Sequence, residues 1–300
     1  MLPPALLARG ARRHGVFSAS DALACGLDHD ELARLLRSGA VVRLGRGVYA
    51  PAECVAADPQ RCAHAAALLA YESRGAVLAG RSAACAWGLP LIGPAPQRVE
   101  LVVEEGREGL APGWILRVAA LPRAHRAEAS GLPATSLART VLDIGRAHGF
   151  LDAVVAADAA LARGLDRGEL AAAGEVMAGW PGMRPAMRAA AFADGRSGSA
   201  AESLSRVRFA EHGLPAPQLQ VRLTDAEGLV GFADFCWPGV VGECDGRLKY
   251  ADPEALWAEK RREDRIRALG LRVVRWGWDD AWARPAWLCG RIGAALREAA

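Results

Sequence analysis

Lysine is nearly absent from this chain of 300 residues, because Lys249 and Lys260 are the only lysines among its 37 basic residues. Arginine therefore carries almost all of the positive charge. The formal net charge is only +3, so the protein as a whole is not a polycation. Any affinity for nucleic acid must come from local clusters of arginine.

Long hydrophobic runs are missing as well. No uninterrupted apolar stretch approaches the roughly 20 residues that a membrane-spanning helix needs. A signal peptide has its basic residues before the apolar run, whereas here they follow it, in "MLPPALLARGARRHG". We therefore expect a cytoplasmic protein that has no membrane partner.

Closely spaced metal ligands are also lacking, since the seven cysteines form no C-x-x-C pair. Structural zinc sites need paired close ligands. The nearest approach is Cys62 with His64, and no second pair lies nearby. We predict reduced thiols that pack as small hydrophobic side chains.

The composition that remains is that of a globular chain with ample core material, at 52% hydrophobic and 24% charged residues. A chain of this length is expected to form two or three domains. The order of the expected elements predicts a multidomain protein of the α+β or α/β class, with domains at residues 1–53, 54–195 and 196–300.

Residues 1–53 show the pattern of a winged helix-turn-helix. A helix is expected near residues 2–13, a second one capped by Ser18, and a third one capped by Asp28. Two extended runs then flank a turn at residues 45–47. In such a fold the third helix and the wing contact DNA, which here predicts the following contacts: Arg34, Arg37, Arg43 and Arg46. The alternative is a small helical cap whose arginines are only solvated.

Residues 54–195 are alanine-rich and are expected to be mostly helical, with two strands in "RVELVVEEG" and "WILRVAALP". His64, His125 and His148 are isolated, so we interpret them as structural or surface residues. Together with residues 1–53, the stretches "VLAGRSAACAWGLPLI" and "ATSLARTVLDIGR" resemble the AbiEi-type antitoxins of type IV toxin–antitoxin systems. That resemblance implies a winged helix-turn-helix, transcriptional autoregulation and a toxin as a candidate partner.

Residues 196–300 follow the order α-β-β-β-α-β-α. Side chains two apart on a strand share a face, so Glu243 and Asp245 point the same way. Asp234 lies on the preceding strand, which a tight turn places beside them. Three carboxylates are therefore expected at one sheet edge, where they suit Mg²⁺ (or Mn²⁺), with Glu202 of the preceding helix available for a second ion.

The motifs "ADF", "ECDG" and "EKRREDRIRALGLRVVRW" resemble, in this order, the PD-(D/E)xK restriction-endonuclease-like nucleases, and more closely the group related to very-short-patch-repair endonucleases. The resemblance implies that Asp234 and Glu243 bind metal and that Glu202 is the acid carried by the helix. Asp245 stands where the pattern has its lysine. Either Lys249 or Lys260 is expected to supply the missing cation, with Lys249 slightly preferred because it is nearer in the chain.

These observations predict a Mg²⁺-dependent DNA endonuclease or nickase that acts in phage defence or DNA repair, with a homodimer as a candidate assembly. Two alternatives stay open. One is a non-catalytic DNA-binding regulator or antitoxin, and the other is a nuclease fold kept only as a scaffold. The tryptophans Trp276, Trp278 and Trp282 are expected to pack in the core and against the final helix rather than to stack on bases.

Overall fold

The computed structural model describes residues 2–245 and 253–300. It has a mixed α/β architecture with three sheets in these residues. The described residues fall into two compact units, which are taken in turn below. The first lies within Met1–Ala147 and Gly168–Met183, and the second within His148–Arg167 and Arg184–Ala300. No helix in the described part of the chain is long and apolar enough to cross a membrane.

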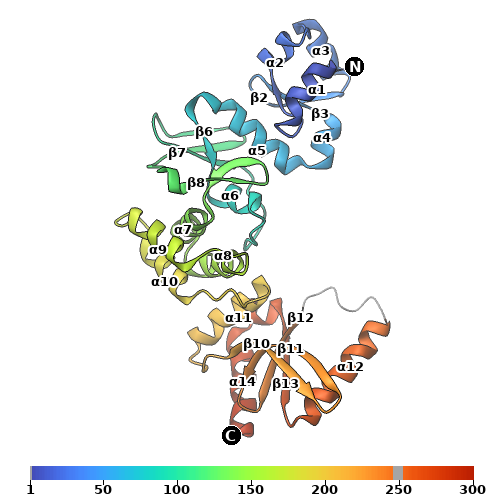
Figure 1. The fold of residues 1–300 in the computed structure, drawn as a ribbon, viewed down its shortest axis with the longest axis vertical. Coiled ribbons are helices and arrows are strands. Elements are labelled where there is room, and N and C mark those ends of the chain that lie inside the picture. The colour runs from blue at the N-terminus through green and yellow to red at the C-terminus, as the bar shows by residue number, and fades with distance from the viewer. Residues whose placement is uncertain (1, 246–252) are drawn as a thin grey trace. The chain divides into compact units, whose positions relative to one another are not determined.

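The first unit begins with three helices and a three-stranded antiparallel sheet of order β1-β3-β2 (Figure 1). Ser18 caps α2 by accepting from the Asp21 amide at 3.0 Å, and Asp28 caps α3 by accepting from the Glu31 amide at 2.8 Å. Both predicted caps are confirmed. The elements are α1 (Pro4–Ala11), β1 (Phe17–Ser18), α2 (Ala19–Ala24), α3 (His29–Arg37), β2 (Val41–Gly45) and β3 (Val48–Pro51).

The core beneath this N-terminal segment continues into the residues that follow it. Val48 and Ala50 of β3 are buried in the same cluster as Cys62 of α5 and Leu101 of β5. Apolar side chains that share one core lose their burial together. Residues 1–53 are therefore structurally continuous with the region that the sequence assigned to a separate domain.

The rest of the first unit surrounds a six-stranded mixed sheet of order β6-β7-β5-β4-β9-β8. The two predicted strands are β5 and β7, but the expectation of a mostly helical region missed the other four. Each of those has only two to four residues, which is too short for alternation to be visible. The elements are α4 (Ala52–Ala57), α5 (Pro59–Ala70), η1 (Glu72–Arg74), β4 (Val77–Leu78), α6 (Gly80–Ala86), β5 (Val99–Val103), β6 (Gly109–Ala111), β7 (Trp114–Val118), η2 (Arg123–His125), β8 (Arg126–Ala129), β9 (Leu132–Thr135), α7 (Leu137–His148) and α9 (Arg167–Val176).

The second unit begins with α8 (Phe150–Ala162) and α10 (Met183–Phe192), which pack with α11 (Ala200–Glu211). The buried carboxylate of Asp158 on α8 accepts from Ser203 Oγ at 2.7 Å and from Arg206 Nη1 at 2.6 Å, both on α11. The boundary expected at residues 195/196 separates helices that the structure holds together by this buried contact.

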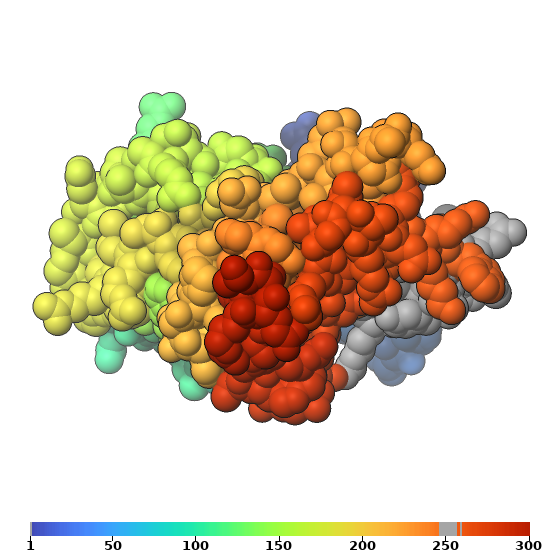
Figure 2. All heavy atoms as spheres, turned by 90° about the horizontal axis from the view of Figure 1, so that it is seen from below, coloured from blue at the N-terminus to red at the C-terminus, as the bar shows by residue number. Residues whose placement is uncertain are grey.

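A four-stranded sheet of order β10-β11-β12-β13 follows, in which only the β12–β13 pair is parallel (Figure 1). Ile266 of α12 packs on one face, while Leu204 of α11 and Leu288 of α14 pack on the other. The last residues of α14, dark red in Figure 2, lie on the surface of this unit. The elements are β10 (Gln218–Asp225), β11 (Gly228–Trp237), β12 (Val240–Asp245), α12 (Pro253–Ala268), β13 (Arg272–Gly277), α13 (Trp278–Ala283) and α14 (Pro285–Ala299).

The predicted order of elements agrees with this domain, except that the expected final helix is divided into α13 and α14 before Pro285. Trp276 is buried against Phe209 and Phe235, as expected of a core residue. Trp282 stacks on Trp278 with ring centroids 5.7 Å apart, but its side chain is exposed.

The buried His64 of α5 makes stability depend on pH. Burial lowers the pKa of His64 from 6.5 to about 4. The unfolded chain therefore binds more protons between these values, and the free energy of unfolding should fall as the pH falls from about 6.5 to 4. In His64→Gln this dependence should flatten, measured by urea unfolding across that range. The exposed His148→Gln is the matched control, and an unchanged slope in His64→Gln would contradict the assignment.

Candidate functional site

Asp234 lies on β11 at the point where the pairing of β11 with β12 ends. The register runs from the Trp237–Val240 pair to the Phe235–Gly242 pair. Beyond it, the Cys244 amide donates to Asp234 Oδ2 at 2.9 Å. The Asp234 carboxylate thus takes the place of a backbone carbonyl as the acceptor. This hydrogen bond fixes the side chain where the pairing of β11 with β12 ends.

A glutamine that the sequence analysis did not identify joins two of the predicted acids. Gln220 Nε2 donates to Glu202 Oε2 at 3.0 Å and to Asp234 Oδ1 at 3.2 Å. Gln220 adopts a positive φ of 50°, which is unusual for a residue other than glycine. This irregularity in β10 could not be read from an alternating sequence pattern.

Glu202 is held in place at the start of α11. Its carboxylate accepts from the Gly198 amide at 2.8 Å and from Ser199 Oγ at 2.9 Å. Burial raises the pKa of Glu202 above its ordinary value, and the negative charge of Asp234 acts in the same direction. A carboxyl group with a raised pKa beside a second carboxylate is a common feature of functional sites.

Glu243 on β12 is buried and is paired with an arginine of α12. Arg262 donates to both of its carboxylate oxygens, at 2.9 and 3.1 Å. Burial raises the pKa of Glu243, the charge of Asp234 adds to that effect, and Arg262 opposes it. The charge of Asp234 therefore acts on both Glu202 and Glu243.

Asp245 also has a cationic neighbour, because Arg275 Nη1 of β13 lies 3.5 Å from Asp245 Oδ2. The charge of Arg275 also opposes the rise that burial causes in the pKa of Glu243, so one arginine lies near both acids of β12. Glu243 and Asp245 thus have Arg275 as a common cationic neighbour.

Lys260 does not complete this acid cluster. The expectation that Lys260 projects its ammonium toward Glu243 is corrected, since Lys260 is exposed and its Nζ lies 5.1 Å from the centroid of the Trp257 ring. The cation that reaches Glu243 is Arg262, two residues farther along the helix. The rotation of α12 about its axis decides which of these two side chains reaches Glu243. Lys249 lies outside the described residues.

The acids fit a divalent cation only in part. In residues 2–245 and 253–300, no group of three or more His, Cys, Asp or Glu side chains is arranged to hold a metal ion. Mg²⁺ commonly takes one or two protein carboxylates and completes its shell with water. Glu202 and Asp234 meet that requirement, because the single amide nitrogen of Gln220 reaches both. Glu243 is occupied by Arg262.

The arginines predicted to contact DNA are exposed in the first unit. Arg34 and Arg37 lie on α3, while Arg43 and Arg46 lie on the β2–β3 hairpin. Arg34 has one neighbouring acid, Glu31, at 3.6 Å with both side chains exposed, which neutralises little of its charge.

Gly45 holds one side of this hairpin close to the six-stranded sheet. A Cβ on Gly45 would lie 2.5 Å from the ring of Trp114, so only glycine permits this approach. The hairpin therefore packs at Gly45 against Trp114 of the six-stranded sheet, while Arg46 at its turn remains exposed.

Comparison with known proteins supports the assignment of the N-terminal segment. Residues 5–52 match the family model of AbiEi antitoxins, described as transcriptional regulators, so this region is AbiEi-like. Over 267 residues the chain is 29% identical to two proteins of Mycobacterium tuberculosis, Uncharacterized protein MT2308 and Uncharacterized protein Rv2248. Each alignment covers 88% of this chain and 95% of the relative. The crystal structure of the RV2827C protein from the same organism superposes with a TM-score of 0.43 at 20% identity, covering 68% of this chain and 84% of that chain.

Removal of the Gln220 amide tests the link between the acids. Gln220→Ala leaves Glu202 and Asp234 without their shared donor, and should lower the free energy of unfolding by about 1–3 kcal/mol at pH 7. Alanine keeps the same backbone strain, because both residues carry a Cβ. The matched control is Gln218→Ala, an exposed residue of the same strand. Equal unfolding midpoints in urea for the two variants would show that the amide bridge has no energetic role.

Proposed function

We propose that the protein is a DNA-binding transcriptional regulator of the antitoxin type, with a toxin as its protein partner. The observation that carries this proposal is the exposure of four arginines on α3 and the β2–β3 hairpin, within the segment that matches the AbiEi family model. Three helices followed by a hairpin give the order of elements of a winged helix-turn-helix.

The spacing of these arginines supports two modes of contact. Arg34 and Arg37 are three residues apart on α3, so they share one face of the helix. A recognition helix presents such a face to the base edges in the major groove. In this proposal Arg43 and Arg46 on the hairpin contact the phosphates beside that groove.

The charge of the hairpin should be measurable as salt dependence. We expect Arg43→Ala/Arg46→Ala to weaken DNA binding and to reduce the slope of log K against log salt by about 0.9 for each phosphate that the variant no longer neutralises. The measurement is fluorescence anisotropy with promoter-proximal duplex DNA over a salt series. Deleting the whole segment is unsuitable, because Val48 and Ala50 belong to the shared core.

Arg123→Ala serves as the control for this measurement, since it removes an exposed arginine from the same unit but away from α3 and the hairpin. If the double variant has the slope of the parent protein, the hairpin does not contact phosphate and another surface binds DNA.

A second candidate function is metal-dependent cleavage of DNA phosphodiesters by the C-terminal domain. The joint hydrogen bonding of Glu202 and Asp234 to Gln220, beside the Glu243–Arg262 pair, favours it. In this proposal Glu202 and Asp234 hold Mg²⁺ or Mn²⁺, which when bound supplies an activated water and neutralises phosphate charge. Arg262 stays protonated at all relevant pH values, so it stabilises negative charge and does not act as a base.

Plasmid cleavage separates the two proposals. With Mg²⁺ we expect the parent protein to relax or linearise supercoiled DNA, and expect Asp234→Asn to lower the rate at least about a hundredfold, the contribution typical of a positioned catalytic group. EDTA should abolish cleavage. Asp264→Asn, an exposed acid on α12, is the control. Plasmid that stays supercoiled with the parent protein, or cleavage that persists in EDTA, would leave only the regulator.

A further inference from the structure

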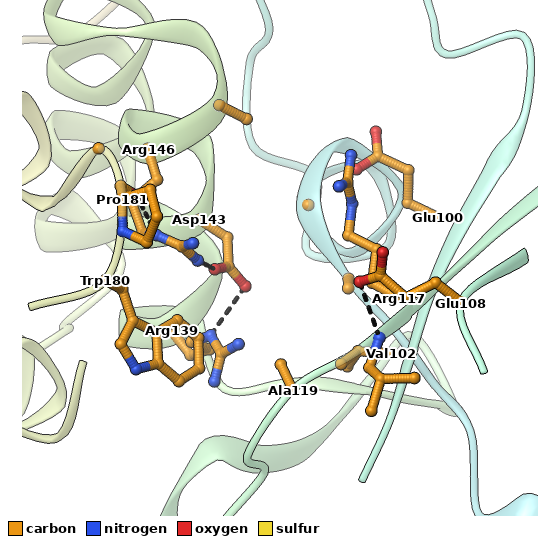
Figure 3. A pocket seen from close by; sticks show the side chains of 15 residues that line it. Glu100, Val102, Glu108, Arg117, Ala119, Arg139, Asp143, Arg146, Trp180 and Pro181 are labelled. Atoms are coloured by element: carbon orange, nitrogen blue, oxygen red, sulfur yellow. Dashed lines mark hydrogen bonds and ion pairs between the residues drawn. The ribbon is translucent and has the colours of Figure 1, made fainter. Parts of the chain in front are cut away.

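The first unit contains a cavity of about 620 Å³ that neither proposed function uses. One wall is formed by α7 and by residues just after α9, and the other by the six-stranded sheet (Figure 3). All of its lining residues belong to this one compact unit. The side chains that matter for its chemistry are Arg139, Asp143, Arg146 and Trp180 on one wall, and Glu100, Glu108 and Arg117 on the other.

Arg139 of α7 is a buried cation in the wall of this cavity, because only 2% of the residue is exposed. Its Nε donates to Asp143 Oδ2 at 2.8 Å, and its Nη1 donates to the Ala120 carbonyl at 3.1 Å. Among the described residues, none accepts a hydrogen bond from its Nη2. A guanidinium that is fixed on two of its three nitrogens and lines a cavity is a preorganised donor.

Arg146 is fixed in the same way, farther along α7. Its Nη1 donates to Asp143 Oδ1 at 2.9 Å and its Nε to the Pro181 carbonyl at 2.9 Å. The guanidinium carbons of both arginines also lie over the Trp180 ring. Their distances to the ring centroid are 4.6 Å for Arg139 and 4.8 Å for Arg146. One carboxylate, Asp143, is shared by two cations, so this wall keeps excess positive charge.

The opposite wall has mixed charge. Arg117 of β7 forms no hydrogen bond or ion pair with any described residue, and Figure 3 shows it beside Glu100 and Glu108. Glu108 is exposed and accepts a long hydrogen bond from the Val118 amide, at 3.4 Å. Carboxylates in such a position accept hydrogen bonds from hydroxyl groups of a ligand.

We propose that this cavity binds a small organic phosphate that carries hydroxyl groups, of the size of a sugar phosphate or a mononucleotide. Arginine forks match phosphate oxygens in geometry and charge, and the two fixed guanidiniums with Arg117 provide them from both walls. Glu108 then receives a hydroxyl group of the ligand. The volume falls within the roughly 300–1,000 Å³ that is usual for sites of small molecules.

The test uses the full-length protein in EDTA, so that binding of metal complexes at the acid cluster does not contribute. The probes are ribose 5-phosphate, AMP and GMP, with adenosine, ribose and inorganic phosphate as their separated parts. We expect at least one phosphate ester to raise the Tm of the parent protein and to bind in isothermal titration calorimetry. The separated parts should bind at least about tenfold more weakly, because each of them reaches only one half of the site.

Arg117→Ala is the decisive variant, because Arg117 has no partner among the described residues and its removal should not disturb the fold. The Kd of the ester should rise at least about tenfold in Arg117→Ala, as expected when a charged hydrogen bond is removed, and stay unchanged in the exposed control Arg98→Ala. Three results would overturn the proposal: no ester binds, Arg117→Ala binds like the parent, or inorganic phosphate or adenosine alone binds as tightly as the ester.

Discussion

The buried carboxylate of Asp158 joins α8 to α11 in the second unit. It is 1% exposed and accepts hydrogen bonds from Ser203, from Arg206 and from the Asp194 amide. Burial raises the pKa of Asp158, while these partners lower it. A buried charge that loses its partners destabilises a fold strongly, so α8 and α11 are obliged to stay together here. The helix that carries Glu202 is thereby fixed in position.

The placement of α11 determines which groups offset the negative charge of the acids on α11, β11 and β12. Ser203 is tied to α8, so the preceding residue, Glu202, faces β10 and β11, where Gln220 can reach it and Asp234 together. On the other side, α12 brings Arg262 to Glu243. One pair of acids thus shares a neutral amide, whereas Glu243 and Asp245 have the arginines Arg262 and Arg275 as neighbours. In the proposed cleavage reaction, Glu202 and Asp234 are therefore the pair that would hold the metal ion.

Local features of the fold could be predicted from the sequence, and features set by packing could not. The caps at Ser18 and Asp28 depend on residues three apart, so the sequence alone identifies them. The expectation that Asp234 lies beside Glu243 rests on the tight turn between their two strands. The role of Gln220 depends on an irregular backbone conformation, and that of Arg262 on the rotation of a helix about its axis. Neither leaves a periodic signal, and strands of two to four residues leave none either.

The scarcity of lysine bears on what the C-terminal domain does. A lysine near a metal site can lose its proton when burial or nearby positive charge lowers its pKa, whereas an arginine remains charged. Arg262 beside Glu243 therefore stabilises a fixed negative charge but cannot take a proton from water. In the proposed cleavage reaction the proton acceptor must then be a carboxylate or the bulk solvent. In that proposal Glu202 and Asp234 hold the metal ion and Glu243 is paired with Arg262, so we assign the uptake of the proton to bulk solvent.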